Sequence, residues 1–207
     1  FVDATRSVLG ETPHFEAQVM TGTSFWASRI TRFGDFSLTG HQGLAVGDVN
    51  GDGMEDLFVC DGGSLPNRLY AQQADGTVHD VSGEAGIDWL EDSRSALLID
   101  LDNDGDQDLV VATIGVIAFA ENDGIGKFTL RGGHPGAQYP FSLSAADFDS
   151  DGDLDIHACV YSAGDTASAR GFEATSPTPF NDAENGGRNL LLMNLGEFKF
   201  VDVTKQV

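Results

Sequence analysis

DLDNDGDQDL, residues 100–109, places an aspartate at every second position. Two like charges about 4 Å apart cost about 4 kcal/mol at an effective dielectric constant of about 20, so such a stretch needs a compensating charge. The same frame recurs as DVNGDGMEDL at 48–57 and as DFDSDGDLDI at 147–156, and the three starts lie 52 and 47 residues apart. The shared pattern, D-x-[DN]-x-D-G-x-x-D-[LI], therefore marks three internal repeats.

The charge of the chain indicates cations as its partners. The 207 residues carry a net charge of −22, and fourteen of the 33 acidic residues lie in these three loops. Nucleic-acid phosphates and anionic lipid surfaces repel so acidic a chain, so we expect no nucleic-acid partner. No apolar run reaches the roughly 18 residues of a membrane-spanning helix, so we expect no membrane insertion.

Short apolar runs flank each acidic loop and predict buried β-strands, so each loop is expected to join two strands. The runs before the loops are GLAVGD (43–48), SALLID (95–100) and SLSAAD (142–147), and those after them are DLFVC (56–60), DLVVAT (108–113) and DIHACVY (155–161).

A hairpin pattern completes each repeat. NRLYAQQADGTVHDVS (67–82) aligns without a gap with NLLLMNLGEFKFVDVT (189–204), and IAFAENDGIGKFTL (117–130) has the same register. Turn residues such as Asp-Gly separate two strand-like runs in these segments. Each repeat is therefore predicted to form four antiparallel strands, which is the blade of an all-β propeller.

The repeat frame predicts that residues 1–207 form a single partial propeller of three full blades plus one strand of a fourth. The segments are 1–5 (FVDAT, last strand of a preceding blade), 6–42 (insertion), 43–82 (blade), 95–131 (blade), and 142–204 (blade with an insertion at 162–188). Because propellers close with about four to eight blades, we expect packing against the remainder of a larger propeller or against another copy of the chain.

The loop pattern predicts a site for a hard cation. Calcium takes six to eight oxygen ligands, and a loop with ligands at positions 1, 3, 5 and 7, the last through a backbone carbonyl, wraps around it with a glycine at position 6. An EF-hand also needs a Glu at position 12 and a helix, but Val59, Val111 and Ala158 stand there within predicted strands. A dockerin-like loop is excluded for the same reasons, because it also needs an acidic residue at position 12 and a helix. The remaining class closes the loop at position 9.

The three loops and the run NRLY…DGTVHDVSGEAGI at 67–87 resemble the FG-GAP/VCBS repeat family, whose blades are similar to those of integrin alpha-subunit propellers. The second run resembles bacterial members that carry an ASPIC/UnbV-type module. The resemblance omits residues 10–40 and 162–188. It implies a calcium-stabilised propeller with side-chain ligands at positions 1, 3, 5 and 9 and a carbonyl ligand at position 7.

On this resemblance the chain would bind about three calcium ions, one in each loop. The implied ligands are Asp48, Asn50, Asp52, Met54 and Asp56 in the first loop, Asp100, Asp102, Asp104, Asp106 and Asp108 in the second, and Asp147, Asp149, Asp151, Asp153 and Asp155 in the third. Asn50 lowers the charge of the first loop. The side chain at position 7 is expected to be free.

The blade topology places the three acidic loops on one face of the propeller and the long connections 6–42 and 162–188 on the other. Long loops on a rigid scaffold commonly carry recognition, so we expect a protein or glycan partner on that second face. The aromatic residues and arginines of 6–42 fit such an interface, but we favour the alternative that they pack into the propeller rim or cover neighbouring blades.

Three functions remain open at this stage. The first is a non-catalytic calcium-binding recognition or adhesion module that is extracellular, at the cell surface or periplasmic. The second is a structural component that assembles with its own copies. The third is a calcium-dependent propeller hydrolase of the phytase type, which ranks last because the chain has only 11 basic residues and no cluster of them near the loops. We therefore expect no catalytic residues and no cofactor besides calcium.

Overall fold

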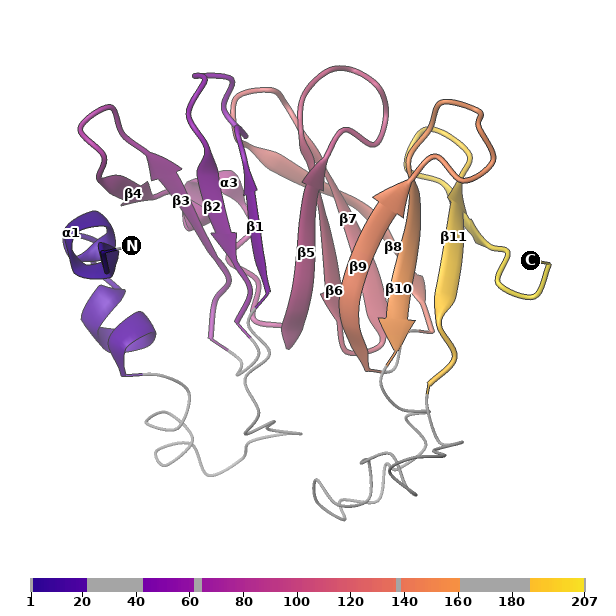
Figure 1. The fold of residues 1–207 in the computed structure, drawn as a ribbon, viewed down its shortest axis with the longest axis horizontal. Coiled ribbons are helices and arrows are strands. Elements are labelled where there is room, and N and C mark those ends of the chain that lie inside the picture. Colours follow the sequence, from indigo (N-terminus) through magenta and orange to yellow (C-terminus); the bar gives the residue numbers. More distant parts are fainter. Residues whose placement is uncertain (1, 22–42, 62–64, 137–138, 161–186, 207) are drawn as a thin grey trace, which may run out of the picture.

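The computed structural model describes residues 2–21, 43–61, 65–136, 139–160 and 187–206 (Figure 1). Three antiparallel four-stranded sheets dominate this part of the chain, and each sheet runs in simple sequence order from its first to its fourth strand. The prediction of an all-β propeller segment with four-stranded blades is thereby confirmed.

The strands of each blade are short. Blade 1 comprises β1 (Leu44–Gly47), β2 (Asp56–Val59), β3 (Arg68–Gln72) and β4 (Val78–Asp80). Blade 2 comprises β5 (Ser93–Ile99), β6 (Asp108–Thr113), β7 (Val116–Asn122) and β8 (Phe128–Pro135). Blade 3 comprises β9 (Pro140–Ala146), β10 (Asp155–Val160), β11 (Leu190–Asn194) and β12 (Phe200–Asp202).

The blades stack face to face, with the first strands β1, β5 and β9 side by side (Figure 1). Strand β6 is buried on both faces. Its alternate residues point to opposite sides of the sheet, and a neighbouring blade covers each side. Leu109 and Val111 belong to a hydrophobic cluster between blades 1 and 2, whereas Val110 and Ala112 belong to a second cluster between blades 2 and 3. Burial on both sides explains why DLVVAT is apolar throughout.

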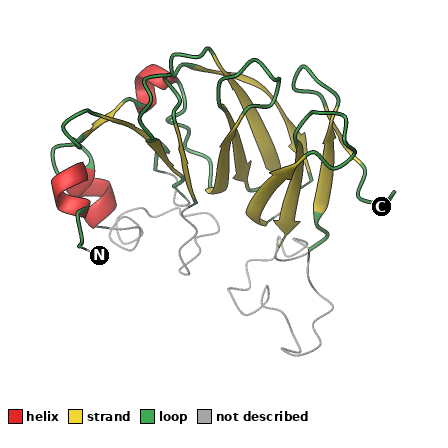
Figure 2. Ribbon diagram, turned by 45° about the horizontal axis from the view of Figure 1, so that its top comes forward, coloured by secondary structure: helices red, strands yellow, loops and turns green. Residues whose placement is uncertain are grey.

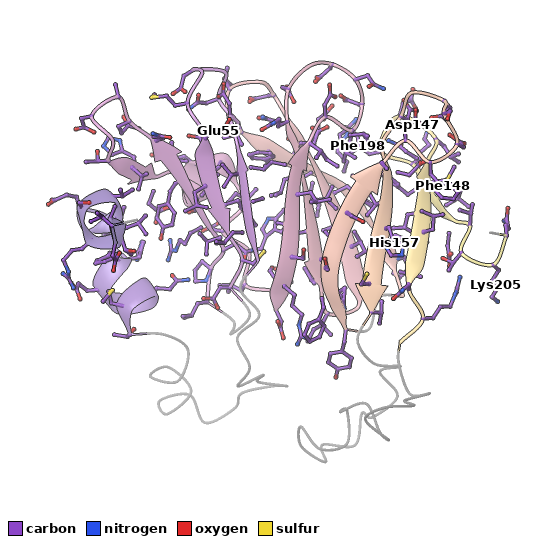
Figure 3. The ribbon with its side chains drawn as sticks, viewed as in Figure 1. Glu55, Asp147, Phe148, His157, Phe198 and Lys205 are labelled. Carbon is purple, nitrogen blue, oxygen red and sulfur yellow. The ribbon has the colours of Figure 1, made fainter. Side chains whose placement is uncertain are left out.

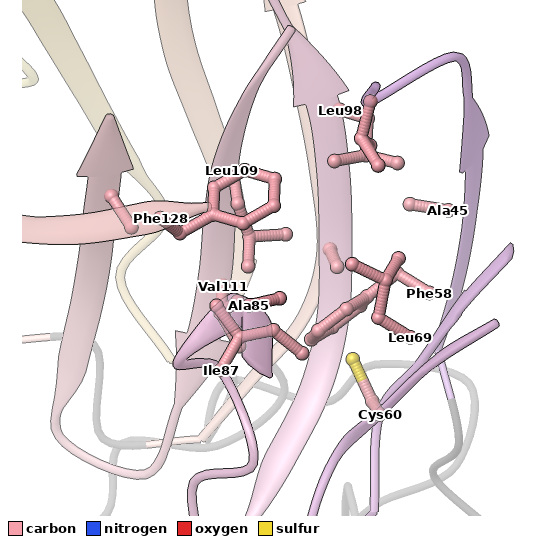
Figure 4. Packing of buried hydrophobic residues seen from close by; sticks show 13 residues of the cluster. Ala45, Phe58, Cys60, Leu69, Ala85, Ile87, Leu98, Leu109, Val111 and Phe128 are labelled. Carbon is pink, nitrogen blue, oxygen red and sulfur yellow. The ribbon is translucent and has the colours of Figure 1, made fainter. Parts of the chain in front are cut away.

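The cluster between blades 1 and 2 contains Phe58 from β2, Phe128 from β8 and Ile87 from the connection between the blades (Figure 4). Phe58 and Ile87 are completely buried. The two clusters join the three blades into one continuous packed unit that carries the three acidic loops.

A hydrogen bond between neighbouring blades accompanies this packing at the loop end. The Asn122 side chain donates from Nδ2 to the carbonyl oxygen of Val49 at 2.8 Å, and Asn194 does the same to Leu101 at 2.9 Å. Val49 and Leu101, the second residues of the first two loops, are 2% and 1% exposed. Each of the first two loops is thus anchored to the blade that follows it.

Phe148 occupies the equivalent position in the third loop and is 56% exposed. Figure 3 shows it beside Asp147 at the loop end of blade 3. Among the described residues, no side-chain amide reaches its carbonyl oxygen, and none of the three described blades packs on this side.

The expectation that residues 1–5 form a strand is not met in the described residues 2–5. Residues 2–4 lie outside any strand, and helix α1 (Thr5–Leu9) begins directly afterwards. A β-strand needs a partner for its backbone hydrogen bonds, and within the described residues no third strand of a preceding blade precedes β1.

FVDAT nevertheless shares a local structure with its sequence equivalents. Asp3 accepts a hydrogen bond from the Thr5 amide at 3.0 Å, as Asp80 accepts one from the Ser82 amide at 3.1 Å. Helix α3 (Ser82–Ala85) follows the second turn, as α1 follows the first. The sequence similarity therefore reflects a shared D-x-[ST] turn, also present at Asp202 and Thr204, and it does not require a strand.

The described part of the first insertion packs on blade 1. After α1, the π-helix η1 (Phe15–Met20) buries Phe15 completely, and Gln18 donates to the Asp61 carboxylate at 3.1 Å and to the Pro66 carbonyl at 2.9 Å. Residues 22–42 and 161–186, which include most of the predicted partner face, lie outside the described residues.

Candidate metal centre

The three acidic loops are the connections between the first and second strands of the blades. We refer to residues 48–56, 100–108 and 147–155 as loops 1, 2 and 3 and number their positions from the first aspartate. Figure 2 shows these loops, in green, along one side of the strands together with the turns between the third and fourth strands. This confirms the expectation that each acidic loop joins two strands.

The aspartate at position 1 organises the backbone of its own loop. Asp48 accepts hydrogen bonds from the amides of Gly51 at 2.8 Å, Asp52 at 3.1 Å and Gly53 at 2.8 Å. Asp147 accepts from Asp151 and Gly152 in the same way. Backbone N–H groups therefore hold the first carboxylate of the loop toward the loop centre.

The glycine at position 6 is required by its backbone conformation. Gly105 has φ +98°, in the region that residues with a side chain rarely adopt. An added Cβ would meet no atom within 4 Å there, so conformation, not space, selects glycine.

The aspartate at position 9 ties three strands together. Asp108 is fully buried and accepts hydrogen bonds from the amides of Leu101 and Asn122, both at 2.9 Å. Asp56 and Asp155 make the equivalent pairs of hydrogen bonds. Position 9 thus connects the loop with the start of the second strand and the end of the third, a structural role in addition to the predicted ligand role.

Two of the loops bring three carboxylates together. One oxygen from each of Asp100, Asp102 and Asp108, at positions 1, 3 and 9, lies within 4.8 Å of the others in loop 2. In loop 3 the group within the same distance comes from positions 1, 3 and 5, Asp147, Asp149 and Asp151. Among the described residues, loop 1 forms no such group, and it has Asn50 at position 3 where the others have aspartate. Asp104 and Asp155 lie outside these groups of three.

Two carboxylate oxygens in loop 2 are buried without a partner. The Oδ1 atoms of Asp100 and Asp106 are inaccessible to solvent, and neither has a hydrogen-bond partner among the described residues. Buried polar atoms almost always have a partner, and an oxygen that faces other carboxylates can be satisfied by a proton or a cation. These two atoms therefore fit a site for a hard cation.

The pKa values of two aspartates in loop 2 also indicate that the loop lacks a compensating positive charge. Burial raises the pKa of Asp108 to about 7, although its two backbone hydrogen bonds oppose the shift. Burial and the neighbouring aspartates, Asp104 first among them, raise the pKa of Asp106 to about 6. A raised carboxyl pKa means that the surroundings disfavour the negative charge, which a divalent ion would reverse.

The side chains at position 7 of loops 2 and 3 face other residues of the loops. The partly buried Asp106 side chain faces the other aspartates of loop 2, and the Asp153 carboxylate accepts a hydrogen bond from Asn103 at 2.7 Å. Met54, at this position in loop 1, has a backbone amide that donates to Asp52 at 2.9 Å. The sequence also did not single out Asn122 and Asn194, although their equivalent places in two aligned repeats were a usable signal.

Three blades with acidic loops between their first and second strands define a β-propeller repeat protein. A model of the FG-GAP-like repeat matches residues 48–111 and 100–158, which together span more than half of the chain. The chain belongs to the FG-GAP-like repeat family, as the loop pattern indicated.

The chain is also similar to cartilage acidic protein 1 of several vertebrates. It is 31% identical to the Xenopus tropicalis protein over 128 residues, which are 57% of this chain and 19% of the relative. The Homo sapiens and Mus musculus proteins are each 30% identical over 125 residues, with the same shares of both chains. The matched region is thus about a fifth of the length of these relatives. Within the described residues, no helix is both long and apolar enough to cross a membrane.

Proposed function

We propose that this chain is a calcium-binding propeller module whose loops are stabilised by the ion and whose role is recognition. The observation that carries the calcium proposal is loop 2, where three carboxylates converge and two buried carboxylate oxygens have no partner among the described residues. Calcium supplies a divalent charge and accepts six to eight oxygens in flexible geometry.

Loops 2 and 3 are the stronger sites on this proposal. Their aspartates at positions 1, 3, 5 and 9 and the carbonyl at position 7 supply the ligands. Loop 1 offers one charge fewer at position 3 through Asn50, so we expect it to bind more weakly. Magnesium is a poorer fit because it demands a small octahedral shell and loses its water reluctantly.

Calorimetric titration with calcium chloride, together with thermal melts in calcium and in EDTA, tests the proposal. We expect two to three sites, and we expect Tm to fall on chelation because an ion that binds only the folded state adds RT ln(1 + [L]/Kd) of stability. Asp102→Asn should weaken the loop 2 site, because it gives loop 2 the residue that loop 1 has at position 3, Asn50. Glu197→Gln is the matched control, since Glu197 is an exposed acid in the turn between β11 and β12 and pairs with Lys199. Absence of binding at millimolar calcium would refute the proposal.

The expected location is extracellular, at the cell surface or periplasmic, where abundant calcium would keep such sites filled. The family membership and the similarity to cartilage acidic protein 1 support this location.

The partner would be a protein or glycan on the face that carries 6–42 and 162–188. Glycan-array and pull-down experiments in calcium and in EDTA test it, and calcium-independent binding would contradict a role for the loops.

The open side of blade 3 favours a second, structural function. Phe148, Leu195 and Val201 are 56%, 66% and 40% exposed, while the equivalents of Phe148 in loops 1 and 2 are covered by the next blade. We infer that another blade, from the remainder of a larger propeller or from a second copy, packs here. Sedimentation of this chain and of Phe148→Ser in calcium separates the two sources: concentration-dependent association that the variant abolishes supports a second copy.

A further inference from the structure

A hydrogen bond joins two neighbouring acidic loops directly. The Asn103 side chain, at position 4 of loop 2, donates from Nδ2 to Oδ1 of Asp153, at position 7 of loop 3, at 2.7 Å. The two residues are 50 positions apart in sequence and belong to different blades. A hydrogen bond to an ionised carboxylate is stronger than one between neutral groups.

Each partner of this bond is held by the aspartates of its own loop. The residue after Asn103, Asp104, donates its amide to Asp102 at 3.3 Å, and Gly105 donates to Asp100 at 3.1 Å. These contacts hold the backbone that carries Asn103 in its left-handed conformation, with φ 63°.

Loop 3 holds Asp153 in a similar way. The Asp153 amide donates to the Asp151 carboxylate at 2.9 Å, and its carbonyl is the expected ligand at position 7. The Asn103 bond therefore connects the ordered state of loop 2 with the position of a ligand residue in loop 3.

The other two loops lack an equivalent side chain and provide an internal comparison. Position 4 is Gly51 in loop 1, with φ 73°, and Ser150 in loop 3, with φ 64°. The backbone conformation is the same in all three loops, but Gly51 has no side chain to reach Asp106, its corresponding neighbour in loop 2. Loop 1 thus has no such connection with loop 2.

We propose that Asn103 is a positioning residue that couples loops 2 and 3, so that the two loops take up calcium as a cooperative pair while loop 1 fills independently. The inference rests on the proposed function, since it requires that the loops bind calcium. Once the aspartates of loop 2 are fixed, Asn103 is fixed, and it holds Asp153 before loop 3 is filled. Loop 3 then loses less conformational entropy when it binds calcium, so the second ion binds more tightly than the first, which is positive cooperativity. The coupling is reciprocal because binding free energies are linked.

Calcium titration of the full chain and of two variants tests the inference. Asn103→Gly keeps a residue that accepts φ 63° and removes the amide, as Gly51 shows is tolerated in loop 1. Asp153→Ala removes the acceptor and keeps the backbone carbonyl. Neither variant changes an implied side-chain ligand at positions 1, 3, 5 or 9.

We expect cooperative filling of two sites in the original chain. In Asn103→Gly the number of sites should stay the same, while the affinity of the second step falls at least about 5-fold, the lower end of typical coupling. Asp153→Ala should have a similar effect, and the double variant should be no worse than either single one, because both remove the same bond. If Asn103 and Asp153 each acted only within their own loop, the losses in calcium affinity of the two single variants would add in the double variant.

The outcomes distinguish failure of the proposed calcium binding from failure of the proposed coupling between loops 2 and 3. If the original chain binds no calcium, the proposed function fails. If it binds calcium at independent sites, or if Asn103→Gly leaves the titration unchanged, the sites stand and the coupling is refuted. Gly51→Asn adds a gain-of-function arm: it should bring loop 1 into cooperative filling with loop 2, and unchanged independent filling would count against the mechanism.

Discussion

Asn194 offers the sharpest test of how one blade holds the loop of its neighbour. Its side chain is 1% exposed, and Nδ2 donates to the carbonyl of Leu101 at 2.9 Å and to that of Leu154 at 3.3 Å. Its Oδ1 accepts from the Gly196 amide at 3.0 Å. Asn194→Ala deletes all three hydrogen bonds and leaves the buried carbonyl of Leu101 without its partner, while the Leu154 and Gly196 groups are partly buried.

The expected cost follows from these three contacts. A buried hydrogen bond contributes about 1 kcal/mol net, and an unsatisfied buried partner costs somewhat more, so we expect a loss of about 3 kcal/mol in the free energy of unfolding. For a chain of this size that loss corresponds to a fall in Tm of about 6–12 °C. The Asn194 amide bond to Asp155 belongs to the backbone and should survive the substitution.

Gln72→Ala is the matched control for Asn194→Ala. Gln72 stands at the same place in blade 1, where its backbone amide also bonds the aspartate at position 9, but the structure describes no preceding blade for its side chain to reach. We expect a loss below about 0.5 kcal/mol, as for ordinary surface substitutions. Urea unfolding in saturating calcium gives both values. Equal losses in the two variants would refute the assignment of Asn194 as a link between blades.

Two further predictions concern the loop interior. Leu101→Ala should cost about 3 kcal/mol in urea unfolding, since Leu101 is 1% exposed, whereas Phe148→Ala at the equivalent exposed position should cost less than about 1 kcal/mol; similar losses would contradict the packing described. In EDTA, Tm should fall as the pH rises from about 4 to about 7, because the pKa of Asp108 is raised to about 7 in the folded chain. The folded state then binds more protons than the unfolded state in this window, so its stability is present at the acidic end and lost through pH 7. Melting curves of Asp108→Asn should show a flatter pH dependence, and an equally steep one would assign the effect to other groups.

The sequence predicted the blades because their signals are local. Short apolar runs, turn residues and the repeated loop frame are visible in neighbouring positions alone, and the structure places a strand on each side of each acidic loop. The buried aspartate at position 9 was also predictable as part of the loop. Its hydrogen bond to the end of the third strand was not, because in blade 2 that contact joins Asp108 to Asn122, which lies 14 positions further along the chain.

FVDAT shows where local similarity misleads. Its likeness to VHDVS and FVDVT is genuine at the level of the D-x-[ST] turn, yet among the described residues only the two later copies contain a strand. A strand depends on hydrogen bonds to another part of the chain, whereas a turn and a short helix satisfy their own backbone groups. Sequence similarity alone therefore could not distinguish the two outcomes.

The sequence by itself determined the repeat, the strand order and the identity of the acidic residues, since these follow from composition and spacing along the chain. Only the tertiary structure decided that Val49 and Leu101 are covered while Phe148 is exposed, that Asp106 turns toward its loop, and that Asn103 reaches Asp153. These features depend on the distance and angle between blades, which arise from the packing of two hydrophobic clusters between three sheets and leave no signature in any single repeat.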